Sequence, residues 1–259
     1  MILAGKRILI TRNEEQNEEV AIMVRSAGGV PVLFPTIRLA PPENSGPLDR
    51  EIGRLSSFDW ILFSSANAAR FFCDRSSQLG LVTWPSELRV ASVGPGTSDE
   101  LVSRGVRVFL TAKKHTADGL YEAIRPHGVA GRCFIIPRVE DQRDYLAEAI
   151  RRDGGEVVSV VAYRNTIAEK DEETAAHIVA RPPDVCVFAS PSAFSNLFSL
   201  LGENEARDML KKSRIAVIGE VTARAVRARE FDVDIMPKTY TLKALMNAVE
   251  VFFTNSGSR

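Results

Sequence analysis

Short runs of apolar residues alternate along this chain with stretches in which apolar residues recur at helical spacing. Residues 8–10 form the first run, and Val20, Met23 and Val24 then follow the i, i+3, i+4 pattern of one helix face, which a glycine pair at 28–29 ends. Short continuous apolar runs are typical of strands that are buried on both faces of a parallel sheet. The pattern therefore predicts an α/β fold in which parallel sheets are covered by helices on both faces.

The same order of elements occurs twice along the chain. Three pairs of segments correspond to one another: 5–12 with 131–138, 63–68 with 188–193, and 89–94 with 214–219. A chain of 259 residues is long enough for two modest domains. The repeat therefore predicts two similar domains with a cleft between them.

Three local signals refine the predicted elements. Pro31 lies in the second apolar run and indicates either the first residue of a strand or an edge strand, because proline donates no ladder hydrogen bond. The apolar residues at 106–109 and at 233–236 predict one further strand in each half. Thr116 and Thr241 suit the N-cap of the last helix of each half.

The domain boundary has two possible positions. The repeat alone divides the chain near Gly128. Two equivalent extended stretches, 33–41 and 160–168, allow a different division in which the chain crosses between the lobes twice. One domain would then be central, and the other would be built from both chain ends.

Charge and hydropathy exclude some classes of partner. Lys and Arg together number 33, and so do Asp and Glu, so the net charge gives no support to a nucleic-acid-binding protein. No apolar run reaches the length of about 18 residues that a membrane span needs, and the first residues do not read as a signal peptide. We expect a cytoplasmic monomer with neither a nucleic-acid nor a membrane partner.

The cysteines and histidines show no metal-site pattern. Cys73, Cys133 and Cys186 have no CxxC spacing, and the last two lie in apolar runs, where we expect small core residues. The three histidines are far apart, and the chain contains no GxxxxGK[ST], HExxH or GxSxG motif. We therefore expect an enzyme without a metal or a nucleotide cofactor, which acts by binding, orientation and proton transfer.

Polar residues follow the apolar runs where a parallel sheet binds ligands. In open α/β sheets, ligands bind beyond the carboxyl ends of the strands, against helix N-termini. Ser65 and Asn67 occupy one such turn, and Ser190 and Ser192 occupy its counterpart. These side chains either contact a ligand or cap their own helices, and the repeat does not separate the two roles.

Glycine turns follow the third apolar run of each half. The segment 94–96 has a GxG pattern, but Asp99 stands where a dinucleotide fingerprint needs glycine or alanine. A strand-to-helix turn with free backbone N–H groups, which suits an anion, fits better. Thr97 and Thr222 would add hydroxyl groups to the two turns; the alternative is that they cap the helices.

Arg12 and Arg138 end the paired first strands of the two halves. A guanidinium group there suits carboxylate or phosphate recognition, because its planar fork donates two parallel hydrogen bonds. The alternative is an ion pair with a nearby acid: Glu14, Glu15, Glu140 or Asp141. Four further basic residues follow the last strands and either add positive potential or form a solvated face: Lys113, Lys114, His115 and Lys238.

Tyr163 breaks the symmetry of the repeat. It follows the apolar residues 160–162, and the equivalent position of the first half is Ile37. A phenol can donate a proton or a hydrogen bond in a partly buried site, so Tyr163 is the candidate catalytic residue. The alternative is a packed ring with a solvated hydroxyl group.

Taken together, these residues resemble the uroporphyrinogen-III synthase family over nearly the whole chain. Six short motifs carry the resemblance: Ile-Thr-Arg at 10–12, Phe-Ser-Ser-Ala-Asn-Ala at 63–68, Val-Gly-Pro-Gly-Thr at 93–97, Ala-Tyr-Arg at 162–164, Ser-Pro-Ser-Ala at 190–193 and Ile-Gly-Glu-Val-Thr-Ala at 218–223. The resemblance implies two α/β domains joined by a two-stranded linker near 33–41 and 160–168, with the active site in the cleft. It also implies a central domain over 38–164 and a second domain from 1–36 and 166–259.

The resemblance implies site residues as well. The linker tyrosine of the family falls on Tyr163. Other family positions fall on residues already singled out: Arg12, Ser65, Thr97, Ser190 and Thr222. Asn13 departs from the family pattern, which often has proline there.

The reaction implied is a lyase step of porphyrin and heme biosynthesis. The linear tetrapyrrole hydroxymethylbilane, which carries eight carboxylates, loses water to form an azafulvene cation and closes through a spiro intermediate to uroporphyrinogen III with its last ring inverted. One rival function is a two-lobed cytoplasmic small-molecule-binding protein without catalytic activity. Another is a nucleotide-sugar or methyl-donor transferase, suggested by the GxG turn.

Overall fold

The computed structural model describes residues 1–81, 83–141 and 144–256, and contacts within the chain define two compact units. Unit 1 comprises Met1–Arg38 and Thr166–Arg259, and unit 2 comprises Leu39–Asn165. Each unit has its own sheet of mainly parallel strands with helices on both faces, which confirms the predicted fold class. Gly128 lies inside unit 2, so the units do not coincide with the sequence repeats.

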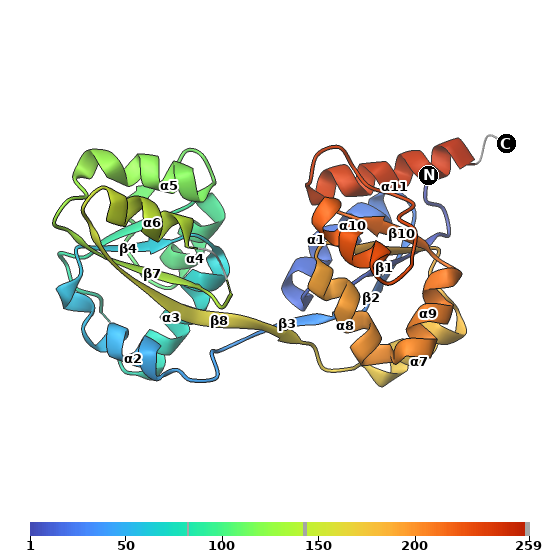
Figure 1. Cartoon of the computed structure of the whole chain (residues 1–259), viewed down its shortest axis with the longest axis horizontal. Coiled ribbons are helices and arrows are strands. Elements are labelled where there is room, and N and C mark those ends of the chain that lie inside the picture. Colours follow the sequence, from blue (N-terminus) through green and yellow to red (C-terminus); the bar gives the residue numbers. More distant parts are fainter. Residues whose placement is uncertain (82, 142–143, 257–259) are drawn as a thin grey trace. The chain divides into compact units, whose positions relative to one another are not determined.

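The sheet of unit 1 has four described parallel strands, in the spatial order β10 (Arg214–Val217), β9 (Val185–Phe188), β1 (Arg7–Ile10) and β2 (Val30–Leu33). Two groups of helices cover it. One face packs against α1 (Glu14–Ser26) and α11 (Leu242–Ser256), and the other against α7 (Glu172–Ala180), α8 (Pro191–Leu201), α9 (Glu203–Lys211) and α10 (Glu220–Arg227) (Figure 1).

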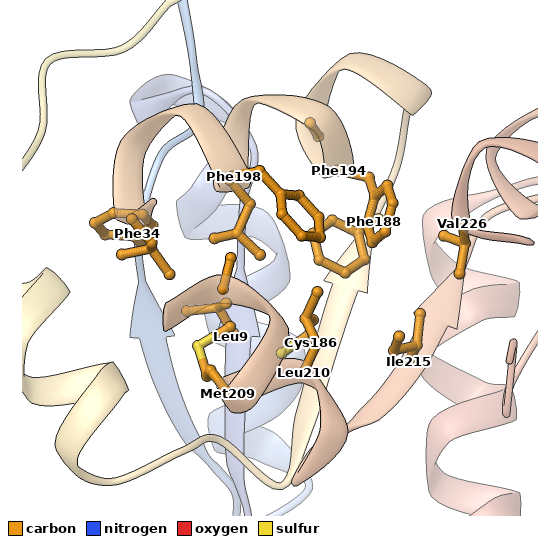
Figure 2. Packing of buried hydrophobic residues seen from close by; sticks show 14 of the residues in the cluster. Leu9, Phe34, Cys186, Phe188, Phe194, Phe198, Met209, Leu210, Ile215 and Val226 are labelled. Carbon is orange, nitrogen blue, oxygen red and sulfur yellow. The ribbon is translucent and has the colours of Figure 1, made fainter. Parts of the chain in front are cut away.

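Strand β1 shows why the apolar runs are continuous. Its side chains alternate between the two faces: Ile8 and Ile10 pack into the cluster of α1 and α11, whereas Leu9 packs into the cluster of α7 to α10. All three are fully buried. Figure 2 shows the second cluster, in which Phe194 and Phe198 of α8 lie over the sheet. A strand covered on both faces therefore favours apolar side chains, and in β1 only the first residue, Arg7, is polar.

The sheet of unit 2 has six described strands, in the spatial order β3 (Ile37–Ala40), β8 (Glu156–Ile167), β7 (Cys133–Val139), β4 (Trp60–Phe63), β5 (Arg89–Ser92) and β6 (Leu110–Thr111). The strands from β8 to β6 are parallel. One face packs against α2 (Gly46–Gly53), α3 (Ala66–Gln78) and α4 (Pro95–Ser103), and the other against α5 (Ala117–Ile124) and α6 (Tyr145–Arg152). The described part of the unit also contains the 3₁₀ turns η1 (Leu55–Ser57) and η2 (Arg125–His127).

The chain passes between the units in β3 and returns in β8, and these two strands are neighbours. The N–H of Ala168 donates to the carbonyl of Thr36 (3.3 Å), and the hydroxyl of Thr166 donates to the carbonyl of Arg38 (3.2 Å). Residue numbers rise on one strand as they fall on the other, so β3 and β8 run in opposite directions. This pair is the two-stranded linker.

Some predictions made from local sequence signals were confirmed, and others were wrong. Pro31 lies in β2, the last strand in the order of its sheet, as predicted. Thr116 and Thr241 each accept the hydrogen bond of a helix N-cap, from Gly119 (3.0 Å) and Ala244 (3.2 Å). The strand predicted at 106–109 was wrong: β6 comprises only Leu110–Thr111, and the chain before it is irregular.

In unit 1, the strand predicted at 233–236 is reduced to a single bridge. It joins Ala216 to Ile235. Edge segments such as this one and β6 make fewer backbone hydrogen bonds to neighbouring strands than central strands do. An apolar residue of such a segment can therefore be buried even where the backbone is irregular.

Candidate anion-binding edges of the two sheets

In unit 2, the polar turns lie side by side at the carboxyl edge of the sheet. Strands β4 and β5 are in register, with Phe63 opposite Ser92. Ser65 and Gly94 each stand two residues beyond that pair, at the same level of two adjacent strands. The turns that start α3 and α4 are therefore neighbours.

Unit 1 repeats this arrangement. Phe188 of β9 lies opposite Val217 of β10, so Ser190 and Gly219 follow at the same level. Helices α8 and α10 start at these turns. Each sheet thus has two adjacent strand-to-helix turns whose backbone N–H groups point beyond the carboxyl edge.

The serines of these turns cap their helices. The Ser65 hydroxyl oxygen accepts from the N–H of Ala68, and the Ser190 oxygen accepts from the N–H of Ala193, both at 3.1 Å. A capping hydroxyl still has its own proton to donate, so capping leaves room for ligand contact. Ser192 is exposed, with its oxygen 3.1 Å from that of Ser190.

Asn67 is the counterpart of Ser192 in unit 2. It is the second residue of α3 and is half-buried. Both side chains therefore start from the first turn of a helix next to a capping serine. The structure brings Ser65 and Asn67 together in one unit and Ser190 and Ser192 together in the other.

The two threonines do not cap their helices. The N-caps of α4 and α10 are Gly94 and Gly219, and Thr97 and Thr222 are the third residues of these helices. Thr97 is 5% exposed and Thr222 is 2% exposed. Neither side chain hydrogen-bonds to another residue in the part of the chain that the structure describes. Two largely buried threonines thus lie in the first turns of two helices, at the positive ends of the helix dipoles.

Arg12 lies two residues beyond β1, beside the turn of Ser190. Burial lowers the pKa of its guanidinium group, while the negative charge of Glu19 opposes this shift. Arginine remains charged because its ordinary pKa is far above neutrality. The side chains of the alternative partners Glu14 and Glu15 lie outside the described residues.

Arg138 lies near the carboxyl end of β7. Its Nη1 donates to the carbonyl of Val139 (3.0 Å), and its Nε is 4.0 Å from Oδ2 of Asp144. Asp144, the N-cap of α6, is thus an ion-pair partner that the sequence pattern did not indicate. This contact partly neutralises the charge of Arg138. Strand β7 pairs with β4, so Arg138 lies at the same end of the sheet as Ser65.

Tyr163 lies next to this edge at a β-bulge. The register of β7 and β8 shifts there, with Arg138 opposite Val161 and Val139 opposite Tyr163. Its side chain is 7% exposed and belongs to the core cluster of unit 2, where its ring stacks on Phe71 (centroids 5.3 Å apart, planes at 13°). The packed-ring alternative therefore holds for the ring, and any chemistry must come from the hydroxyl group.

The sequence pattern missed a chain of hydroxyl groups in unit 2. Ser92 is fully buried, and its oxygen is 3.2 Å from that of Thr111, which is 3.2 Å from that of Ser98. This chain joins β5, β6 and α4 at the carboxyl edge. The available signal was the single serine in an apolar run, because the equivalent residue of the other half is Val217.

The described residues show no metal site and no membrane helix. No group of three or more His, Cys, Asp or Glu side chains is placed to hold a metal ion. Among the described helices, none is both long and apolar enough to cross a bilayer. Hydroxyl groups, backbone N–H groups and guanidinium groups dominate the two edges, and these are groups that bind anions.

These features define a protein of two α/β units that are linked by two antiparallel strands, and each unit has two polar strand-to-helix turns at the carboxyl edge of its sheet. A family model described as uroporphyrinogen-III synthase HemD matches residues 18–247. The chain therefore belongs to the uroporphyrinogen-III synthase family.

Individual relatives and solved structures agree with this membership. Uroporphyrinogen-III synthases of Synechococcus elongatus and Chlorobaculum parvum are each 29% identical, over 96% and 94% of this chain and 96% and 98% of theirs. The crystal structure of uroporphyrinogen-III synthetase from Helicobacter pylori has a TM-score of 0.60 at 14% identity, over 98% of this chain and 100% of that one. At this identity the structural likeness establishes the fold alone.

Proposed function

We propose that this protein is a uroporphyrinogen-III synthase that cyclises hydroxymethylbilane to uroporphyrinogen III with loss of water. The family match over residues 18–247 carries the proposal. This chain aligns with nearly the full lengths of the related uroporphyrinogen-III synthases of Synechococcus elongatus and Chlorobaculum parvum, which supports transfer of the whole activity.

The two carboxyl edges suit this substrate because it carries eight carboxylates. Backbone N–H groups at the starts of α4 and α10 offer hydrogen bonds and the positive ends of two helix dipoles. Hydroxyl donors come from Ser65, Ser190, Thr97 and Thr222, and Arg12 adds a charged guanidinium group that can donate two parallel hydrogen bonds. We propose that these groups, with Asn67, Ser192 and Arg138, bind the acetate and propionate side chains.

The reaction needs only heterolytic bond changes and proton transfers. The hydroxymethyl carbon loses its hydroxyl group as water after protonation, which leaves the azafulvene cation. A substituted carbon of the last pyrrole attacks this cation to form a spiro intermediate, which fragments and closes again with that ring inverted. No electron is gained or lost overall, so the reaction needs no redox cofactor. We propose that the protein works without any cofactor.

We propose that Tyr163 assists departure of the hydroxyl group as a proton or hydrogen-bond donor. Its position supports this role, because the bulge in β8 sets it beside the carboxyl edge, and bulges often re-aim a side chain next to an active site. The acid transfers its proton to the leaving oxygen and recovers one from the α-position that loses its proton at ring closure.

One incubation tests the proposed function. Freshly made hydroxymethylbilane closes by itself to the I isomer, whereas the synthase gives the III isomer. We expect the III isomer from this protein, and formation of the I isomer alone would overturn the proposal. We further propose a cytoplasmic monomer without nucleic-acid or membrane partners, which light scattering of the purified protein tests with respect to its mass.

A further inference from the structure

An aromatic ring covers the glycine turn of each unit. A Cβ atom placed on Gly94 would lie 3.0 Å from Cδ2 and 3.1 Å from Cγ of His115. A Cβ atom placed on Gly219 would lie 3.0 Å from both Cδ1 and Cγ of Tyr240. His115 and Tyr240 occupy equivalent positions of the repeat, one residue before the caps Thr116 and Thr241. The same contact thus occurs twice, with two different aromatic residues.

The backbone of these turns does not itself require glycine. Gly94 has φ 175° and Gly219 has φ −178°, which is extended backbone that other residues also adopt. The close ring contact favours glycine, because a Cβ at 3.0 Å from a ring carbon is tighter than ordinary van der Waals contact and the ring would have to move away by a few tenths of an ångström. Glycine at both positions therefore allows the aromatic ring to contact the backbone of the turn.

Both rings contact the glycine turns but remain exposed to solvent. Both glycines are buried, whereas Tyr240 is 62% exposed and His115 is also exposed. One side of each ring thus lies against the backbone, and much of the ring remains accessible to a ligand. The start of a helix and a buried threonine, Thr97 or Thr222, lie within the same turn.

We propose that His115 and Tyr240 are substrate-binding residues that each stack on a pyrrole ring of the tetrapyrrole. The inference rests on the proposed function and extends it from the carboxylates of the substrate to its rings. A pyrrole bearing acetate and propionate presents a flat face and two anions, and each turn offers a flat ring beside N–H donors. Aromatic stacking of this kind contributes about 2- to 12-fold in affinity.

Three substitutions at one turn test the proposal. Tyr240→Ala removes the ring, and we expect KM for hydroxymethylbilane and Kd for uroporphyrinogen III, measured without oxygen, to rise about 2- to 12-fold. Tyr240→Phe keeps the ring and retains both values. Gly219→Ala displaces the ring, so it raises both values in the wild-type background and has no further effect in the Tyr240→Ala background.

A matched control removes an exposed side chain elsewhere in unit 1. Ile22 of α1 is 55% exposed, and Ile22→Ala leaves KM and Kd unchanged. Unchanged KM and Kd in Tyr240→Ala would overturn the stacking proposal, as would an equal rise in Tyr240→Phe. Either result leaves the proposed function intact as long as the wild-type protein forms the III isomer. Failure of the wild type to form that isomer would instead remove the proposed function.

Discussion

Removing one oxygen atom from Tyr163 separates its chemistry from its packing. The ring is 7% exposed and stacks on Phe71, and its hydroxyl group makes no hydrogen bond to a residue that the structure describes. Tyr163→Phe therefore keeps the ring contacts, and we expect the free energy of unfolding to change by less than about 1 kcal/mol. Tyr163→Ala empties a core position and costs about 3–5 kcal/mol, as truncation of a buried aromatic ring does.

The loss of turnover measures what the hydroxyl group does. A general acid contributes about 100- to 10,000-fold in rate. A hydrogen bond to a group that becomes charged in the transition state is worth about 1.5–3 kcal/mol, which contributes about 12- to 150-fold. We expect Tyr163→Phe to lose about 30- to 150-fold, which corresponds to about 2–3 kcal/mol of barrier.

The assay is single-turnover formation of uroporphyrinogen III from hydroxymethylbilane with enzyme in excess. Excess enzyme removes product release from the measured rate, so the difference between Tyr163→Phe and the wild type reports on chemistry. Urea unfolding of both proteins provides the stability control. Wild-type turnover in Tyr163→Phe would refute a chemical role for this residue.

Three further predictions concern other sites. Thr222→Val, which keeps the shape of a buried residue, raises KM about 2- to 12-fold; unchanged product affinity would count against carboxylate binding there. Burial opposes ionisation of Asp59, but hydrogen bonds from the Cys133 N–H and Arg132 outweigh it and lower its pKa. Asp59→Asn therefore lowers the free energy of unfolding by about 1–3 kcal/mol at pH 7. This difference between the variant and the wild type disappears as the pH falls from about 3.9, the pKa of the unfolded chain, through the lowered pKa of the folded protein. A difference that urea unfolding shows to be independent of pH would refute this prediction. Burial raises the pKa of the Cys73 and Cys186 thiols to about 12, so iodoacetamide at pH 8 labels them only after unfolding, and rapid labelling of the native protein would contradict this.

Features that depend on burial or on a local cap could be predicted from the sequence. Residues 8–10 form a strand because both faces of the sheet are covered, which leaves a continuous apolar run. Thr116 and Thr241 cap helices because capping depends only on the next three residues. The apolar run at 106–109 led to the wrong prediction of a strand. Val106 is buried although its segment is irregular, and Phe109 is 51% exposed.

The turns that carry the candidate site residues could be located from the sequence, but the contacts of their side chains could not. Ser65 and Ser190 mark the turns, yet capping and ligand binding use the same hydroxyl at the same place, so the pattern cannot separate them. The bulge beside Tyr163 depends on the register of β7 and β8, which no local signal encodes. The ring of Tyr240 over Gly219 likewise arises from a contact between residues distant in sequence.

The partition of hydroxymethylbilane between its two ring-closed isomers tests the central claim most directly. Spontaneous closure to the I isomer competes with enzymatic closure at a fixed rate, so the III fraction measures catalysis without a separate standard. We expect the III fraction to rise with protein concentration until the I isomer is nearly absent. A III fraction that stays at the level of the protein-free control at every concentration would contradict the account.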